Sequence, residues 1–412
     1  MDNSFRKPYT LKQQTPIIHF QYSQTGATLR ATEVKPKLDA FILKRVGEET
    51  AKSNGWLIGD TKALNYKMRF CSLGEEYVEF TSPGPYDIYY GNMGEDTIFV
   101  KGVVAKDSTV TMEIICFYED LRQTIDSLLE NFFNVTNFGR MQNKGFGSFI
   151  LDTGNVDSQR TRTIKISKQL CEEYGATHCY NFNGGQACFK RIKTIYSIIK
   201  SGLNFRGYRR SLLFYYMHDM SIGNEKAYLK QRGMAPTDVG PHANSGNYEQ
   251  YRKSTSQHTP FYVRALLGVG EQVEYQKRVG GKTKISIDCT ETDRNDKALI
   301  ERFPSPIFFK VIGGTVYYVG GRIEAYTRKD ETKPTEIWGR EFAFVDKDRA
   351  RTLTLRTPAK NAKPCFNENF MDGFLEYCFN ELTAAKPRNG QETPLWEFPS
   401  MNGVKIYKYP AN

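Results

Sequence analysis

A strand pattern followed at once by a helix pattern is the feature that most limits the fold of this 412-residue chain. Residues 109–118 (TVTMEIICFY) are rich in β-branched and aromatic side chains, which favours a strand. The apolar residues that next recur at helical spacing are Leu121, Ile125, Leu128, Leu129 and Phe132. Because an amphipathic helix must bury its apolar face, this pattern predicts a sheet with helices packed on it.

The same kinds of element extend through residues 1–155. Strands are predicted at 15–22, 66–71, 76–81 and 109–118. A helix follows the first strand, with Pro36 suited to its first turn. The order strand, helix, strands, strand and helix predicts an α+β domain with helices on one face of a mainly antiparallel sheet. A ferredoxin-like or RRM-like unit is the simplest fold of that class.

A second α+β domain is predicted over residues 156–412. Its predicted strands are 162–167, 284–289, 306–312 and 315–320, and its predicted helices are 189–200, 224–232 and 367–383. Gly313 and Gly314 between the last two strands indicate a hairpin. The polar stretch 233–260 predicts a long loop or a functional insertion.

The charge balance predicts an anionic partner. Lys and Arg number 57 and Asp and Glu 46, a surplus of 11, which favours nucleic acid over a membrane surface. A merely soluble basic protein is the alternative. The N-terminal residues do not resemble a secretory signal, no apolar stretch approaches a membrane span, and the eight cysteines form no CxxC pair. We therefore expect a cytoplasmic protein with reduced thiols and no membrane partner.

The tightest group of possible metal ligands consists of Cys171, His178, Cys179 and Cys188. Their spacing matches no zinc pattern, and adjacent ligands are awkward for one ion. Ordinary burial of the cysteines is the favoured interpretation, so we expect neither a metal nor a cofactor.

Residues 143–149 (NKGFGSF) form the strongest candidate for a nucleic-acid contact. Gly145 and Gly147 lack Cβ atoms, so the backbone could approach a phosphate and turn at positive φ. Arg140 and Lys144 supply charge, and Phe146 offers a ring on which a base could stack. The alternative is an ordinary glycine-rich turn between a helix and a strand.

Two further basic segments predict phosphate contacts. Residues 205–210 (FRGYRR) combine aromatic residues with Arg206, Arg209 and Arg210, which suit bidentate phosphate binding and stacking. Residues 26–37 (GATLRATEVKPK) lie where the first strand leads into a helix, whose start favours anions. The cations predicted to contact RNA there are Arg30, Lys35 and Lys37. A solvated basic turn and an ordinary helix start are the respective alternatives.

The sequence gives little evidence for a known enzyme active-site motif. Residues 280–283 (GGKT) lack the glycine that a phosphate-binding P-loop needs at position 276, where the chain has Gln276. The sequence contains neither GxSxG nor HExxH. Of the five histidines, His218 lies closest to FRGYRR and is the first candidate for a general base in RNA cleavage.

The order of these motifs resembles that of the RAMP superfamily, the repeat-associated proteins of CRISPR effector complexes. NKGFGSF resembles its glycine-rich loop, and FYVRALLG at 261–268 resembles an Arg-x-Leu-Phe-Gly element, with Leu267 in place of Phe. RFPSPIFFK at 302–310 is similar to a strand of type III subunits. The resemblance implies ferredoxin-like domains that bind CRISPR RNA or its target. The residues that it places on the RNA backbone are Arg30, Lys35, Arg140, Lys144, Gly145 and Gly147. Those that it assigns to support of the second domain are Arg264, Arg302 and Ser305.

One departure concerns catalysis. Some backbone subunits of the family carry a cleavage aspartate on an early loop, whereas the nearby Asp39 falls in a predicted helix. The leading hypothesis is therefore a non-catalytic RNA-binding subunit of a type III-like CRISPR ribonucleoprotein in antiviral defence, with other effector subunits as partners. The alternatives are a metal-independent endoribonuclease that processes repeat RNA and a protein-interaction scaffold that uses its aromatic C-terminus.

Overall fold

The computed structural model describes residues 5–19, 28–80, 100–154, 158–204, 208–234, 260–270, 272–276, 282–292, 298–300, 303–323, 335–384 and 398–410. These residues form helices and several antiparallel sheets, which confirms the predicted α+β class. No helix among them combines the length and apolar character that a bilayer crossing requires.

The first unit is a four-stranded antiparallel sheet in the order β2-β5-β1-β6. Its elements along the chain are β1 (Arg6–Gln13), α1 (Ala31–Val46), β2 (Lys67–Ser72), β5 (Thr109–Ile115), α3 (Glu119–Val135) and β6 (Phe149–Leu151). This βαββαβ order is the ferredoxin-like arrangement. Additional elements between α1 and β5 are α2 (Glu48–Ser53), the hairpin β3 (Glu75–Phe80) and β4 (Val100–Ala105), and the 3-10 turn η1 (Lys106–Ser108).

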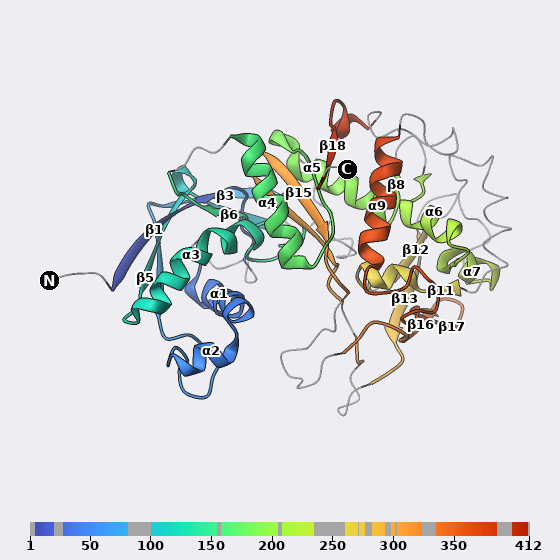
Figure 1. The fold of residues 1–412 in the computed structure, drawn as a ribbon. Coiled ribbons are helices and arrows are strands. Elements are labelled where there is room, and N and C mark those ends of the chain that lie inside the picture. The colour runs from blue at the N-terminus through green and yellow to red at the C-terminus, as the bar shows by residue number, and fades with distance from the viewer. Residues whose placement is uncertain are drawn as a thin grey trace.

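One face of the first sheet carries its helices (Figure 1). Leu11 and Met112 point from the sheet into a core that also contains Leu38 of α1 and Ile125 of α3. The burial of β5 alternates between covered and solvent-facing residues, as expected for a sheet with helices on one side only.

The second unit repeats the arrangement. Helix α4 (Gln159–Tyr174) leads to β7 (Cys179–Asn183), α5 (Cys188–Lys200), β14 (Ile307–Ile312), β15 (Thr315–Gly320), α9 (Phe370–Thr383) and β18 (Ile406–Tyr409). The antiparallel sheet order is β14-β15-β7-β18. Gly313 and Gly314 both have positive φ, at 56° and 76°, which confirms the predicted hairpin between β14 and β15.

A third sheet is built from two insertions in the second unit. Its antiparallel strands are β12 (Gln272–Gln276), β13 (Lys282–Cys289), β16 (Glu341–Asp346) and β17 (Arg351–Arg356). The second unit also contains shorter elements: η2 (Gly185–Ala187), β8 (Leu203–Asn204), β9 (Tyr208–Arg209), α6 (Leu212–Asp219), β10 (Gly223–Asn224), α7 (Glu225–Gln231), β11 (Pro260–Phe261), η3 (Val263–Leu267) and η5 (Pro399–Met401).

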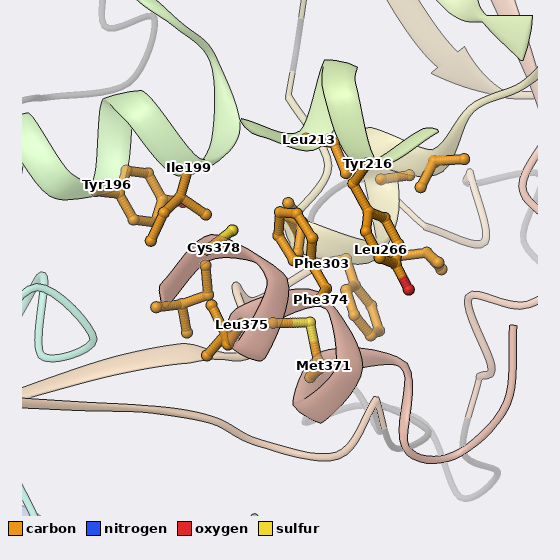
Figure 2. Close-up of a cluster of buried hydrophobic side chains, with 14 of the residues drawn as sticks. Tyr196, Ile199, Leu213, Tyr216, Leu266, Phe303, Met371, Phe374, Leu375 and Cys378 are labelled. Carbon is orange, nitrogen blue, oxygen red and sulfur yellow. The ribbon is translucent and has the colours of Figure 1, made fainter. Parts of the chain in front are cut away.

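Both faces of the second sheet are buried. Val316 and Tyr318 lie in the core that contains α5 and α9, and the alternating residues Tyr317 and Val319 lie in the core shared with α4 and the first unit. Figure 2 shows how α9 fills the first of these cores: its apolar side chains meet those of α5 and α6, together with Leu266 of η3.

Three sequence predictions were wrong in detail. The first strand is 6–13 and not 15–22, because Pro16 has no N–H to donate; of the described residues 15–19, Ile17 forms an isolated bridge. Residues 162–167 belong to helix α4, where Ile166 is buried with Leu170 one turn on. Pro36 lies inside α1, which begins at Ala31.

The division at residue 155 stays a prediction, since 155–157 lie outside the described residues. The same holds for the predicted insertion at 233–260, of which 235–259 are not described.

Candidate nucleic-acid interface

The glycine-rich loop joins the two units. Asn143 donates its side-chain N–H to the Ser305 carbonyl at 2.8 Å, and its own carbonyl accepts from the Phe309 N–H at 3.0 Å. The Ser148 hydroxyl donates to the Val311 carbonyl at 2.6 Å. Lys144 also forms a parallel bridge with Phe309. The loop therefore borders β14, which would otherwise be an unprotected edge strand.

The glycines of the loop have positive φ for a reason inside the protein. At Gly147 (φ +64°) a Cβ would overlap the carbonyl oxygen of Phe138, whose own N–H donates to the Gly147 carbonyl at 3.0 Å. At Gly145 (φ +84°) a Cβ would lie 3.1 Å from both Ile192 and Val311. Both glycines are buried. The close approach that they permit is to protein atoms, and contact of either with RNA stays a prediction.

The prediction that Phe146 stacks on a base is wrong in this structure. Its ring is 1% exposed and stacks instead on Phe189 of α5, with the ring centroids 4.0 Å apart. Phe146 thus fills the core between the loop and α5 and presents no face to a ligand.

Lys35 and Lys37 of α1 are occupied by internal partners. Lys35 bonds to Asp39 at 2.7 Å and to the Leu64 carbonyl at 2.8 Å. Lys37 donates to the Asn137 carbonyl at 2.9 Å, and burial lowers its pKa. Asp39 is itself buried in the helix, and burial raises its pKa. These residues hold α1 in place, and their predicted contacts with RNA stay untested.

Arg30 and Arg140 are placed differently. Arg30 precedes the first turn of α1, whose N-terminus has no side-chain cap. The Gly139 N–H donates to Glu33 in that first turn at 2.6 Å, which brings the adjacent Arg140 to the same end of the helix. Neither arginine side chain has a hydrogen bond or ion pair within the described part of the chain, so both are available to an anion there.

Where the glycine-rich loop packs against α5, the side chains of Lys144 and Lys200 both lie near the ring of Tyr196. The Nζ atoms of Lys144 and Lys200 lie 5.5 and 5.9 Å from the ring centroid of Tyr196. Burial lowers the pKa of both lysines, to about 7 for Lys200, and the Lys200 charge lowers that of Lys144 further. Lys200 also donates to the carbonyls of Leu267 and Gly268 at 2.8 and 3.0 Å.

The short helix η3 adds a further positive charge, Arg264, next to Lys200. Arg264, which the resemblance assigned to support of the second domain, forms a 2.9 Å ion pair with the buried Glu225. Burial, followed by the Arg264 charge, lowers the pKa of the neighbouring Lys226 to about 8, and Arg264 also lowers that of Lys200. Arg264 therefore links the two lysines electrostatically.

We call these cations the basic band. It consists of Arg30, Arg140, Lys144, Lys200, Arg264 and Lys226. Holding like charges half-buried near one another is unfavourable, and an anion that neutralised them would recover that energy. Separate cations contributed by the loop, the start of α1, α5, η3 and α7 suit a polyanion, whose charges repeat along its length.

Lys200 and Lys226 were missed from the sequence. The sequence gives only a weak indication for Lys200. Lys193, Tyr196 and Lys200 share one face of a helix at spacings of three and seven residues, but the apolar spacing of Ile192 and Ile195 dominates the helical pattern. That Lys226 lies near Arg264 depends on folding across 38 residues of sequence.

The FRGYRR segment is only partly described. Arg206 lies outside the described residues, as does Arg302, and Arg209 lies in β9. The guanidinium of Arg210 lies 5.0 Å from the ring centroid of Phe214. The Ser305 carbonyl accepts from the Asn143 side-chain N–H at 2.8 Å, and the supporting role assigned to Ser305 stays a prediction. These placements leave the predicted RNA contacts of the segment untested.

His218, the candidate general base, lies in α6 with its Nδ1 3.5 Å from Asp219. Among the residues that the structure describes, no three His, Cys, Asp or Glu side chains gather to hold a metal ion.

Comparison with known proteins gives two family matches. The model of the Cmr1 N-terminal domain matches residues 5–203, and that of the Cmr1 C-terminal domain matches residues 208–396. No curated protein matches the sequence.

Two solved structures are similar to this chain. The crystal structure of Cmr1 from Pyrococcus furiosus in its apo form is 10% identical, with a TM-score of 0.34, and the match covers 86% of this chain and 99% of that one. The cryo-EM structure of a type III-B Cmr-beta complex bound to cognate target RNA contains a chain that is 15% identical, with a TM-score of 0.27. That match covers 36% of this chain and 58% of the other.

Proposed function

Because the chain belongs to the Cmr1 family of the RAMP superfamily, a family of type III CRISPR effector subunits, we propose that it binds the backbone of guide or target RNA along the basic band. This membership confirms the superfamily indicated by the order of the sequence motifs. Within an effector complex, base pairing would supply sequence specificity, and this subunit would supply backbone contacts.

The observation that carries the proposal is the pair Lys144 and Lys200 over Tyr196. Both amines are half-buried, and their charges act on each other. An RNA phosphate beside them would favour their protonated forms and remove the mutual repulsion. Arg140, four residues before Lys144 in the chain, extends the proposed contact toward the start of α1.

The test is RNA affinity as a function of salt. Single-stranded oligouridylate should bind the wild-type protein with an affinity that falls linearly on a log–log plot against salt concentration. The double variant Arg140→Glu/Lys144→Glu should bind roughly ten- to a hundred-fold more weakly, and its slope should be shallower by about 1.4, or about 0.7 for each lost contact.

The matched control is Arg160→Glu/Lys168→Glu, which makes the same change in charge on exposed residues of α4. It should retain the wild-type slope. Equal slopes and affinities for the two double variants would show that net charge, and not the basic band, determines binding.

A further inference from the structure

The first sheet has a second face, opposite its helices, that is mainly polar and whose residues are exposed or half-buried. Registered neighbours on this face interact directly: Arg69 of β2 pairs with Glu113 of β5 at 2.7 Å, and Lys12 of β1 donates to Thr109 of β5 at 2.7 Å. Because side chains alternate between the faces of a strand, these two contacts fix which residues belong to the face.

We call this surface the open face. Its members are Arg6, Pro8, Thr10, Lys12, Lys67, Arg69, Cys71, Thr109, Thr111, Glu113, Ile115 and Ile150. It carries four cations and one carboxylate, and that carboxylate already pairs with Arg69. Lys67 and Arg6 flank Ile115 in one row across the three strands. The open face is therefore positively charged rather than apolar.

An aromatic pair, the exposed Phe117 and the half-buried Phe5, lies at one end of the open face. Phe117, two residues beyond Ile115, is 76% exposed. Its ring stacks on Phe5 with the centroids 5.0 Å apart and the planes 21° from parallel. The guanidinium of Arg6 lies 5.8 Å from the Phe5 centroid. Such exposure of a large ring costs solvation free energy in the isolated chain, which a stacked ligand would recover.

We propose that the open face is a second binding surface for single-stranded RNA, with a base stacked on Phe117 and phosphates held by Arg6, Lys67 and Arg69. Aromatic rings beside cations on an open sheet suit an unpaired strand, because every base has a stacking face and every nucleotide carries a phosphate. An acidic protein segment would match the charge but would leave the stacked ring pair without a function.

This inference is independent of the basic band, which lies at the junction of the two units. Cys71 provides a reporter on β2, the edge strand of this face, because it is exposed whereas the other seven cysteines are buried or half-buried. In the full chain, a saturating 20-nucleotide oligouridylate should slow alkylation of Cys71 by iodoacetamide. Phe117→Ala and Lys67→Glu should each weaken binding of the same RNA about tenfold.

Lys62→Glu is the matched control for charge, since Lys62 is 76% exposed elsewhere on the first unit; it should bind as the wild type does. Thermal unfolding should show that Phe117→Ala folds normally, because its ring is solvent-exposed. Unchanged Cys71 alkylation in the presence of bound RNA would overturn the proposal, and so would wild-type affinity in both variants.

The two proposals fail separately. RNA that binds through the basic band alone would leave Cys71 reactive, and affinity would still fall in Arg140→Glu/Lys144→Glu. RNA that protects Cys71 while that double variant binds normally would contradict the basic band and support the open face.

Discussion

The two ferredoxin-like units share one topology but differ in how they use their sheets. In the first unit, the face opposite the helices is polar, with Thr111 at the centre of the third strand exposed. In the second, Tyr317 and Val319 occupy the equivalent face of the third strand and are buried. The same chain order therefore yields one sheet with an open polar face and one sheet that serves as the core between units.

The joint between the units, where the first unit packs against the second, accounts for part of this difference. The face that carries Tyr317 and Val319 lies in the core that α4 shares with the first unit, and the glycine-rich loop bonds to β14 at the edge of the second sheet. Lys310 of β14, fully buried, donates to the carbonyls of Thr136 at 2.7 Å and Phe149 at 3.2 Å. Burial lowers the pKa of Lys310 far below its ordinary value. Those contacts tie β14 to both ends of the segment that carries the loop.

The largest effect should come from breaking this joint at Gly147. Gly147→Ala would force its Cβ against the Phe138 carbonyl, so the chain should lose several kcal/mol of unfolding free energy, with about 4 kcal/mol as the expected scale. The matched control is Gly154→Ala, which has a similar φ (+68°) but open space around its Cβ.

Urea unfolding of both variants measures the difference. Gly154→Ala should cost about 1 to 2 kcal/mol, the ordinary price of a left-handed non-glycine residue. Equal losses for the two variants would mean that only the dihedral angle matters and that the loop does not pack closely on Phe138.

A smaller effect is expected from exchanging valine and threonine between the opposite faces of the two sheets. Val319→Thr places a hydroxyl on the buried face of the second sheet and should cost about 1 to 3 kcal/mol. Thr111→Val makes the reverse change on the open face and should alter the unfolding free energy by at most about 0.5 kcal/mol.

The measurement is again urea unfolding, and thermal unfolding should rank the variants in the same order. A loss in Thr111→Val as large as that in Val319→Thr would show that the open face of the first sheet is packed against something in the folded chain.

Much of the fold could be predicted from local pattern. Helix α3 and strand β5 follow directly from their apolar spacing, and β14 and β15 from the hairpin glycines. Helix α4 was missed because polar and apolar side chains alternate over residues 162–167, as they would in a strand. Only the packing of Ile166 against the second sheet shows that this segment is helical.

The candidate site was harder to predict for a different reason. The loop sequence NKGFGSF identifies the right place, but its glycines and Phe146 serve the joint, and Lys144 alone of that motif reaches the basic band. Its neighbours Lys200 and Lys226 come from separate helices, so their proximity depends on tertiary packing that no local pattern encodes.

Contact of RNA with Lys144 and Lys200 can be measured by chemical footprinting of lysines. Acetylation of the full chain, with and without saturating oligouridylate, is followed for each lysine by mass spectrometry. RNA should slow the reaction of Lys144 and Lys200 but not that of Lys62 or Lys168, whose side chains are 76% and 67% exposed away from the basic band. Unchanged acetylation of Lys144 and Lys200 while RNA is bound would contradict the proposed contact.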